Sequence, residues 1–355
     1  MTSRLQKEKN LKTQAAVLTK LGEPLEIWEL DIPPLKAGQV LVKLAFSGLC
    51  HSQLNEIKGL KGEDKFIPHT LGHEGSGIVM AIGPEVTKVQ EGDHVVLSWL
   101  KGSGKDVAAT QYASAYGMVN SGAISTFLQV AVISENRVIP LQREMPLKEA
   151  ALLGCALPTG AGVVKNEMGL KWGEGFAVFG AGGVGLSALM AAKHAGATPL
   201  IAVDVQEAKL QAATRMGATH VVNARHTNPV AAIMEITAGK GVDYVFESAG
   251  KSEAMENAFS SLKAPGLCVL AGNLPKGHHI SIDPFDLIRG KRIVGTWGGG
   301  SQIDADVAAY TELYLSGAYD LASLITHVVP LSEINTLFSE LEAGQVGRGL
   351  IDLSL

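Results

Sequence analysis

Three residues that lie far apart in the chain could together bind one metal ion. Cys50 occurs in GLCHSQ, His73 in LGHEGSG and Cys155 in GCALPTG. Two thiolates and one imidazole form the ligand set of a catalytic zinc ion, with a fourth position open to water or substrate. Taken singly, a cysteine in an apolar segment is usually a small packed side chain, and a histidine beside glycine is often a turn residue. The chain has only three cysteines, so such a site would use most of its sulfur.

A glycine-rich turn forms the second group of candidate residues. In FAVFGAGGVGLSALMAAKHAG, Gly180, Gly182 and Gly185 have G-x-G-x-x-G spacing, directly after a strand-like run and at the start of a helical pattern. The first glycine permits the tight turn, the second lets the backbone approach a pyrophosphate, and the third lets helix and strand pack closely. The motif in this context predicts a dinucleotide site.

Asp204 indicates which dinucleotide this is. It ends the next strand-like run, IAVDV, 19 residues beyond Gly185. A carboxylate in that place can accept hydrogen bonds from the adenosine ribose hydroxyls and repels a 2′-phosphate, so the pattern favours NAD over NADP. Lys209, about one helical turn further on, is predicted as another ribose contact. The ordinary alternative is a solvated aspartate at a strand end.

Composition restricts the class of protein. With 355 residues, 46% of them apolar and 18% charged, the chain predicts a globular protein of two domains. A net charge of -5 without a dense Lys/Arg tract argues against nucleic acid or membrane partners and favours a small-molecule substrate. No apolar run reaches the roughly 20 residues that span a bilayer, and residues 1–12 lack an apolar signal core. Three cysteines that cannot all pair fit a reducing compartment, so a cytoplasmic location is predicted.

Three zones must position these residues. Short strand-like runs separated by turn signals predict a mostly antiparallel β domain from residue 14 to about 138. From about residue 173, strand-like and helical patterns alternate, which predicts a parallel sheet covered on both faces. Helical patterns at 304–317 and 331–344 and a strand-like end at 349–355 are too short to bury a core, so we expect them to pack on the first zone.

The sequence resembles the zinc-dependent medium-chain alcohol dehydrogenases over nearly its whole length, from VLVKLAFSGLCHSQ through LGHEGSGIV, EGDHVV, GCALPTG, FGAGGVGL and VDV to GRGLIDL. The resemblance implies an α/β fold: a doubly wound Rossmann domain at 157–297 is inserted in a GroES-like (chaperonin-10-like), mostly β catalytic domain. That domain would comprise 1–156 and 298–355, with the active site in the cleft between the two. The implied reaction is hydride transfer between an alcohol, or an aldehyde or ketone, and NAD. Relatives are dimers or tetramers, so a homodimer or homotetramer is expected.

The resemblance also implies roles for single residues. It makes Cys50, His73 and Cys155 the ligands of one catalytic zinc. Ser52 would take the alcohol proton, and Glu74 would support the metal from behind or ligate it transiently. Trp99 would join Ser52 in the substrate pocket, although an aromatic residue at a strand end is more often plain core. Further implied cofactor contacts are His51 and Arg348 at the pyrophosphate, Thr159 and Val184 at the nicotinamide, and Gly183, Ala249 and Gly272 along the cofactor groove.

The chain departs from the family pattern in two places. Many members hold a structural zinc with four cysteines, but residues 101–123 contain none, so no second zinc is expected there. This segment should be a loop packed around Tyr112, Tyr116 and Met118, or a mobile one.

The second departure lies beside the first cysteine. Gln53 replaces the aspartate that usually orients the metal-bound histidine, which would weaken metal binding. Asn55 replaces the histidine that ends the proton relay in some members, so the proton would leave through water or through His51. Cys268, in a buried strand pattern, is interpreted as structural.

Two other functions remain open at this point. The same superfamily contains zinc-independent quinone and enoyl reductases, and a nucleotide-binding protein without catalysis is a third possibility. The intact set of Cys50, Ser52, His73 and Cys155 argues against both. The substrate stays open, because an aromatic or bulky alcohol fits the sequence as well as a polyol does. The strand RIVGTW could pair across a two-fold axis at a sheet edge.

Overall fold

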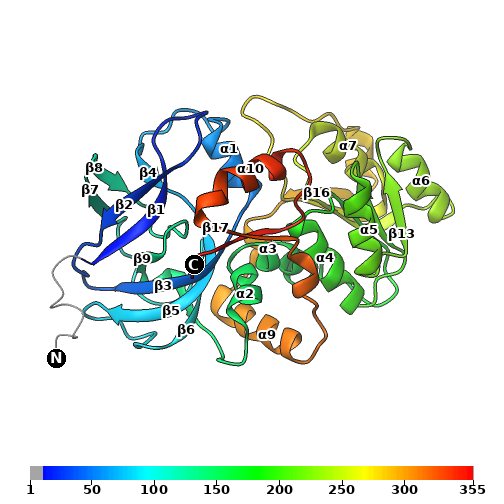
Figure 1. Ribbon diagram of the computed structural model, residues 1–355. Coiled ribbons are helices and arrows are strands. Elements are labelled where there is room, and N and C mark those ends of the chain that lie inside the picture. The colour runs from blue at the N-terminus through cyan, green and yellow to red at the C-terminus, as the bar shows by residue number, and fades with distance from the viewer. Residues whose placement is uncertain (1–10, 355) are drawn as a thin grey trace. The chain divides into compact units, whose positions relative to one another are not determined.

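The computed structural model describes residues 11–354, which form two compact units (Figure 1). The first unit contains the described residues up to Cys155, residues 302–316 and the C-terminal segment from Ile325. The second contains 156–301 and 317–324. Residues 1–12, in which no apolar signal core was predicted, lie almost entirely outside the described residues.

A seven-stranded sheet forms the larger part of the first unit. Its strands, in spatial order, are β10 (Val138–Pro140), β6 (His94–Ser98), β5 (Glu74–Ile82), β3 (Gln39–Gly48), β18 (Gly349–Asp352) and β17 (His327–Pro330), with β9 (Val130–Ser134) also pairing β3. All its pairs except β17 with β18 are antiparallel. The predicted, mostly antiparallel β domain is therefore confirmed.

A small closed barrel completes the β structure of this unit. It is formed by β1 (Lys12–Leu18), β2 (Glu26–Asp31), β7 (Gln111–Ser114), β8 (Gly117–Asn120) and β4 (His69–Thr70). Within the cysteine-free segment 101–123, residues 111–120 thus form the hairpin of β7 and β8, whereas 101–110 contain no helix or strand, as expected for a loop. Of Tyr112, Tyr116 and Met118, only Tyr112 is buried, and its hydroxyl accepts a hydrogen bond from the Val132 N–H at 2.8 Å.

Tyr116 and Met118 are 74% and 52% exposed, so the predicted packing around these two residues is wrong. In a hairpin successive side chains point to opposite faces, and only one face meets the core. Tyr116 instead lies against the Trp28 ring, with ring centroids 4.6 Å apart.

The C-terminal segment packs on the first unit, as expected. β18 pairs antiparallel with β3, and the red ribbon of this segment runs beside β3 in Figure 1. Helix α10 (Ile334–Glu342) buries Leu337, Phe338 and Leu341 in the same core. The first unit also contains α1 (His51–Ile57), α2 (Leu147–Ala150) and α9 (Ile303–Leu315).

The two units differ from the predicted domain division at residue 156, at 298–301 and at 317–324. Residues 317–324 belong to the second unit, although they were expected in the first. Tyr319 is buried there, and its ring meets the His194 ring edge-on at 5.6 Å. This contact between two rings, at the end of a helix of the second unit, holds the segment there. The helical pattern of the sequence does not predict such a contact.

The second unit is built on a six-stranded parallel sheet. Its strands, in spatial order, are β13 (His220–Asn223), β12 (Leu200–Asp204), β11 (Phe176–Phe179), β14 (Val242–Glu247), β15 (Leu262–Leu270) and β16 (Lys291–Gly295). β11 is buried along its full length, FAVF, as a strand covered on both faces must be. The order reverses between β11 and β14, the switch point where doubly wound sheets bind ligands.

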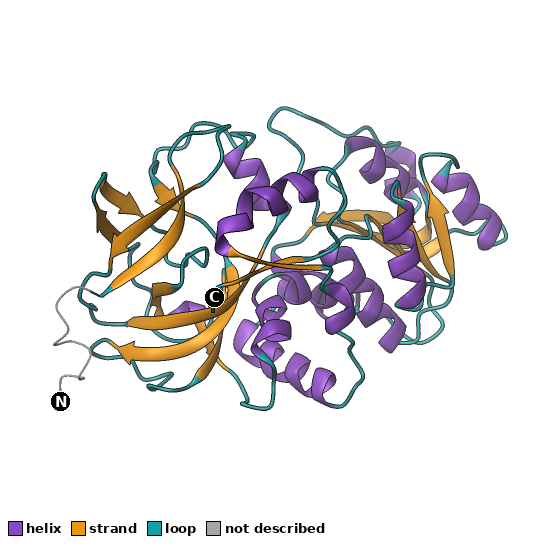
Figure 2. Ribbon diagram, in the orientation of Figure 1, coloured by secondary structure: helices purple, strands orange, loops and turns teal. Residues whose placement is uncertain are grey.

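Helices lie on both faces of this sheet, as Figure 2 shows. The helices of this unit are α3 (Ala156–Gly162), α4 (Gly183–His194), α5 (Glu207–Arg215), α6 (Pro229–Ile236), α7 (Ser252–Ser260) and α8 (Pro284–Ile288). The parallel sheet predicted from the alternating pattern is confirmed. Within residues 11–354, no single helix is long and apolar enough to cross a membrane; the bent pair 147–154 and 156–168 passes by length and composition only.

Candidate metal centre and cofactor turn

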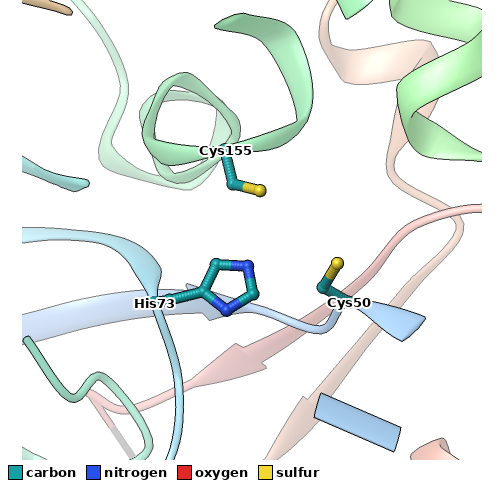
Figure 3. A group of neighbouring side chains, drawn as sticks. All are labelled: Cys50, His73 and Cys155. Atoms are coloured by element: carbon teal, nitrogen blue, oxygen red, sulfur yellow. The ribbon is translucent and has the colours of Figure 1, made fainter. Parts of the chain in front are cut away.

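Cys50, His73 and Cys155 lie together within the first unit. Their ligand atoms are all within 4.8 Å of one another. Cys50 is the residue before α1, His73 precedes β5, and Cys155 follows the short 3-10 helix Ala151–Gly154. Figure 3 shows the two sulfur atoms and the imidazole facing a common space.

Glycines let the segments that carry His73 and Cys155 pack closely against neighbouring parts of the chain. Gly72, just before His73, has φ of +94°, and an added Cβ would lie 2.3 Å from Thr126 Oγ1. A Cβ on Gly154, just before Cys155, would lie 2.2 Å from the Leu97 carbonyl oxygen. These contacts explain why small residues flank the candidate ligands.

The charges around the cluster favour a thiolate at Cys50. The pKa of Cys50 lies well below its ordinary value, although burial opposes this. The hydrogen bond with Cys155 lowers it most, and His73 and Arg348 lower it further. Arg348 and Glu74 form an ion pair with almost no exposed surface. Burial lowers the pKa of Arg348, whereas Cys50 raises it. A cationic surrounding of this kind suits a cysteine that binds metal.

Gln53 does not take the place of the missing aspartate. Its Oε1 accepts the Cys50 backbone N–H at 2.8 Å, which closes a capping box at the start of α1. Its Nε2 is buried and finds no partner among the described residues. Gln53 therefore orients the backbone of one cysteine ligand and not the ring of His73.

A lysine that the motifs did not identify contacts Ser52. Lys61 Nζ donates to Ser52 Oγ at 3.1 Å and to Glu56 Oε2 at 2.9 Å. Asn55 lies on the same helix, and His51 is exposed. Lys61 follows α1 in an irregular loop, and no spacing rule links such a position to Ser52.

Glu56, Asp64 and His69 form a second group of possible metal ligands. These side chains already have partners of their own, since Glu56 pairs with Lys61 and Asp64 with the His69 ring at 2.7 Å. We assign this group no metal.

Trp99 directly follows β6 and is half-buried. Its neighbour Ser98 donates a hydrogen bond to the carbonyl oxygen of Gly154 at 2.7 Å, one residue before Cys155. Trp99 thus lies on the strand end that contacts a ligand segment.

In the second unit, the glycine turn joins β11 to α4. Gly180 has φ of +93°, and its Cβ would meet the Ala249 nitrogen at 2.8 Å. Gly182 is the residue before α4, with nothing within 4 Å of an added Cβ. Gly185 packs so closely that a Cβ would lie 1.9 Å from the Gly180 carbonyl oxygen. Gly183 and Val184 occupy the first turn of α4, whose N-terminal N–H groups suit a phosphate.

Asp204 is held at the end of β12 next to this turn. Oδ2 accepts the Ala181 N–H at 2.8 Å and Oδ1 the Gln206 N–H at 2.9 Å. Lys209 follows on α5. Thr159, on α3, has a buried hydroxyl without a hydrogen-bond partner among the described residues, as a ligand-binding group would in the absence of its ligand.

The loops after β14 and β15 carry Ala249 and Gly272. Both are fastened by Glu247, a fully buried residue that the sequence motifs did not single out. Carboxylates at strand ends are common, and only the hydrogen bonds distinguish this one.

The first unit thus offers a soft, three-ligand metal site, and the second a turn built for a dinucleotide. A metal with an open coordination position polarises an oxygen of a bound substrate, and a dinucleotide carries hydride. Together these parts suit alcohol oxidation or carbonyl reduction.

Comparison with known proteins agrees with this chemistry. Residues 183–315 match the model of the zinc-binding dehydrogenase family, and residues 36–143 match that of the alcohol dehydrogenase GroES-like domain. An S-(hydroxymethyl)glutathione dehydrogenase of Synechocystis is 33% identical over 96% of this chain and 100% of its own length.

Two solved structures are similar throughout. An alcohol dehydrogenase zinc-binding domain protein from Burkholderia ambifaria has a TM-score of 0.90 at 32% identity, covering 97% of this chain and 99% of its own. Benzyl alcohol dehydrogenase from Acinetobacter calcoaceticus has a TM-score of 0.88 at 32% identity, covering 96% and 99%.

Proposed function

Because this chain belongs to the zinc-binding medium-chain alcohol dehydrogenase family, and is a zinc-containing, NAD-dependent oxidoreductase of CH–OH groups, we propose that its reaction takes place at Cys50, His73 and Cys155. The substrates are small alcohols and aldehydes. The observation that carries the proposal is the convergence of two thiols and one imidazole within 4.8 Å. Benzyl alcohol and S-(hydroxymethyl)glutathione, which relatives are named for, are the first candidate substrates.

The donor set fits zinc, because two cysteines and a histidine leave one coordination position open. Zinc bound there supplies a Lewis acid that acidifies an alcohol or polarises a carbonyl. Glu74, paired with Arg348, places a negative charge beside the ligands and balances the cation that lowers the pKa of Cys50. We propose a single zinc per chain, since the only other cysteine, Cys268, lies buried in β15.

For the cofactor, we propose that the turn Gly180–Gly185 holds the pyrophosphate and Asp204 the adenosine ribose. Selectivity for NAD over NADP follows from the negative charge of Asp204. His51, Thr159, Lys209, Ala249, Gly272 and Arg348 remain proposed contacts.

We propose that the proton travels through Ser52 and Lys61, because Asn55 occupies the position of the histidine that ends the proton relay in some family members. Lys61 Nζ is the donor toward Ser52, so the Ser52 proton stays available for the substrate oxygen. In carbonyl reduction, Ser52 gives its proton to that oxygen while Lys61 gives one to Ser52. The resulting neutral amine takes a proton from water.

Replacing Lys61 with methionine should therefore lower kcat of aldehyde reduction about tenfold, the lower range of a general-acid contribution. The KM for NADH should stay unchanged, and Lys61→Arg, which keeps a hydrogen-bond donor but cannot give up a proton, should be as slow as Lys61→Met. Steady-state kinetics between pH 6 and 9 would measure this. Lys65→Met, an exposed lysine in the same loop, is the matched control. Equal rates in the two methionine variants would exclude the route through Lys61.

A single assay tests the proposed function. NADH absorbance is followed with a panel of alcohols and aldehydes, with NAD or NADP, and with or without a zinc chelator. We expect turnover with NAD that chelation abolishes and zinc restores. Turnover that resists chelation would point to a zinc-independent reductase, and binding of NAD without turnover of any substrate would point to a nucleotide-binding protein.

The protein is further proposed to be a cytoplasmic homodimer or homotetramer. β16 is one of the two edge strands of the parallel sheet, opposite β13, among the described residues. Around it, Phe285 and Ile288 of α8 are 59% and 79% exposed. An apolar, unpaired edge of this kind suits pairing with a second copy, and light scattering would give the mass.

A further inference from the structure

One buried residue, through its carboxylate and its backbone carbonyl, ties together the two loops that follow β14 and β15. Glu247 ends β14 and has no exposed surface. Its Oε1 accepts the backbone N–H groups of Ala249 and Gly250, each at 2.8 Å. Its backbone carbonyl oxygen accepts the N–H groups of Ala271 and Gly272 at 2.8 and 3.2 Å.

The loop that Glu247 holds lies directly against the glycine turn. Ser248 Oγ donates to the Gly180 carbonyl oxygen at 2.9 Å. An added Cβ on Gly180 would lie 3.0 Å from Ala249 Cα. Because these backbones touch, a shift of the 248–250 loop must displace the turn as well.

The second carboxylate oxygen has an unusual position. Glu247 Oε2 is buried and makes no hydrogen bond within the described residues, and a Cβ on Gly272 would lie 2.5 Å from it. Burial raises the pKa of Glu247 to about 7, against the lowering effect of the Gly250 and Ala249 N–H groups. The thiol of Cys268 on β15 faces the same carboxylate, and burial raises its pKa, so it stays neutral.

We propose that Glu247 is a positioning residue for the dinucleotide: its carboxylate holds the 248–250 loop in the shape that NAD(H) requires, and protonation loosens that loop. A charged acceptor binds backbone N–H groups more strongly than a neutral carboxyl does. The inference rests on the proposed function, because its ligand is the dinucleotide of that reaction. If the dinucleotide binds the protein with ionised Glu247 more tightly, then by linkage its binding to the protein with protonated Glu247 must release a proton from Glu247.

The test is a fluorescence titration of the zinc-loaded protein with NADH between pH 6 and 9. In the unchanged protein, Kd should rise several-fold as the pH falls through about 7. In Glu247→Gln, which cannot ionise, Kd should be about tenfold higher at pH 8.5 and nearly independent of pH. Glu253→Gln, an exposed residue on α7, is the matched control and should behave as the unchanged protein. If Glu247→Gln keeps both the affinity and the pH slope, the proposal is wrong.

Thermal unfolding adds a readout that needs no ligand. Native Glu247 keeps its proton up to about pH 7, whereas the unfolded chain loses it near the ordinary value of 4.5. The native state then binds more protons between these values, so its stability should fall as the pH rises through this window. Glu247→Gln should lack that part of the slope.

Should Glu247→Gln fail to fold, the unchanged protein still decides the matter. Calorimetry of NADH binding at pH 6.5, in buffers of different ionisation enthalpy, counts the protons released. Release supports the proposal, and its absence overturns it. The proposed function fails separately, namely if the unchanged protein turns over no alcohol or aldehyde.

Discussion

Replacing Cys50 with serine should remove the zinc and lower kcat by about a thousandfold or more, since metal catalysis supplies several kcal/mol of transition-state stabilisation. A serine hydroxyl does not ionise near neutral pH and is a poor zinc ligand. The fold should persist, because Cys50 caps a short helix and its side chain is only partly buried. Elemental analysis, a melting curve and kcat would be measured on the same sample.

Cys268→Ala is the matched control for this experiment. Cys268 is fully buried in β15, so its truncation should cost about 1 kcal/mol of stability and leave the zinc content unchanged. A Cys50→Ser enzyme that retains full zinc and full kcat would remove Cys50 from the metal site.

The second large effect is expected at Gly185. An alanine there places its Cβ 1.9 Å from the Gly180 carbonyl oxygen and 2.9 Å from Ser248 Oγ. The first of these is backbone, which cannot yield without opening the glycine turn. We expect a loss of about 3 kcal/mol in the free energy of unfolding, as for a severe overpacking change, and a loss of NADH binding. Chemical denaturation and NADH fluorescence would measure the two effects.

Gly182→Ala separates folding from cofactor approach. Gly182 has φ of -83°, which alanine adopts easily, and an added Cβ meets nothing within 4 Å. Its stability should therefore equal that of the unchanged protein. If the backbone of Gly182 approaches the pyrophosphate, NADH affinity should nevertheless fall about tenfold or more. Full affinity in both alanine variants would place the dinucleotide elsewhere.

Much of the fold could be predicted, because burial imposes local periodicity on the chain. A strand such as FAVF at Phe176–Phe179, covered on both faces, must be apolar throughout, and a glycine turn must follow where a helix packs closely on it. The hairpin Gln111–Asn120 was not predicted. Its Tyr116 and Met118 are apolar but exposed, so their positions in the sequence do not mark a face that packs on a core.

For the site, residue types and their spacing were enough to identify the side chains that could bind metal and dinucleotide: Cys50, His73, Cys155 and the turn Gly180–Gly185. The contacts of each of these residues became known from the three-dimensional fold. The fold brings three ligands that are distant in sequence within 4.8 Å of one another. It also forms the hydrogen bonds of Gln53 with the Cys50 backbone and of Lys61 with Ser52. It also fastened two loops to Glu247. Residue type and spacing set the chemistry and local geometry, whereas hydrogen bonds between distant segments depend on strand register and packing, which no local pattern encodes.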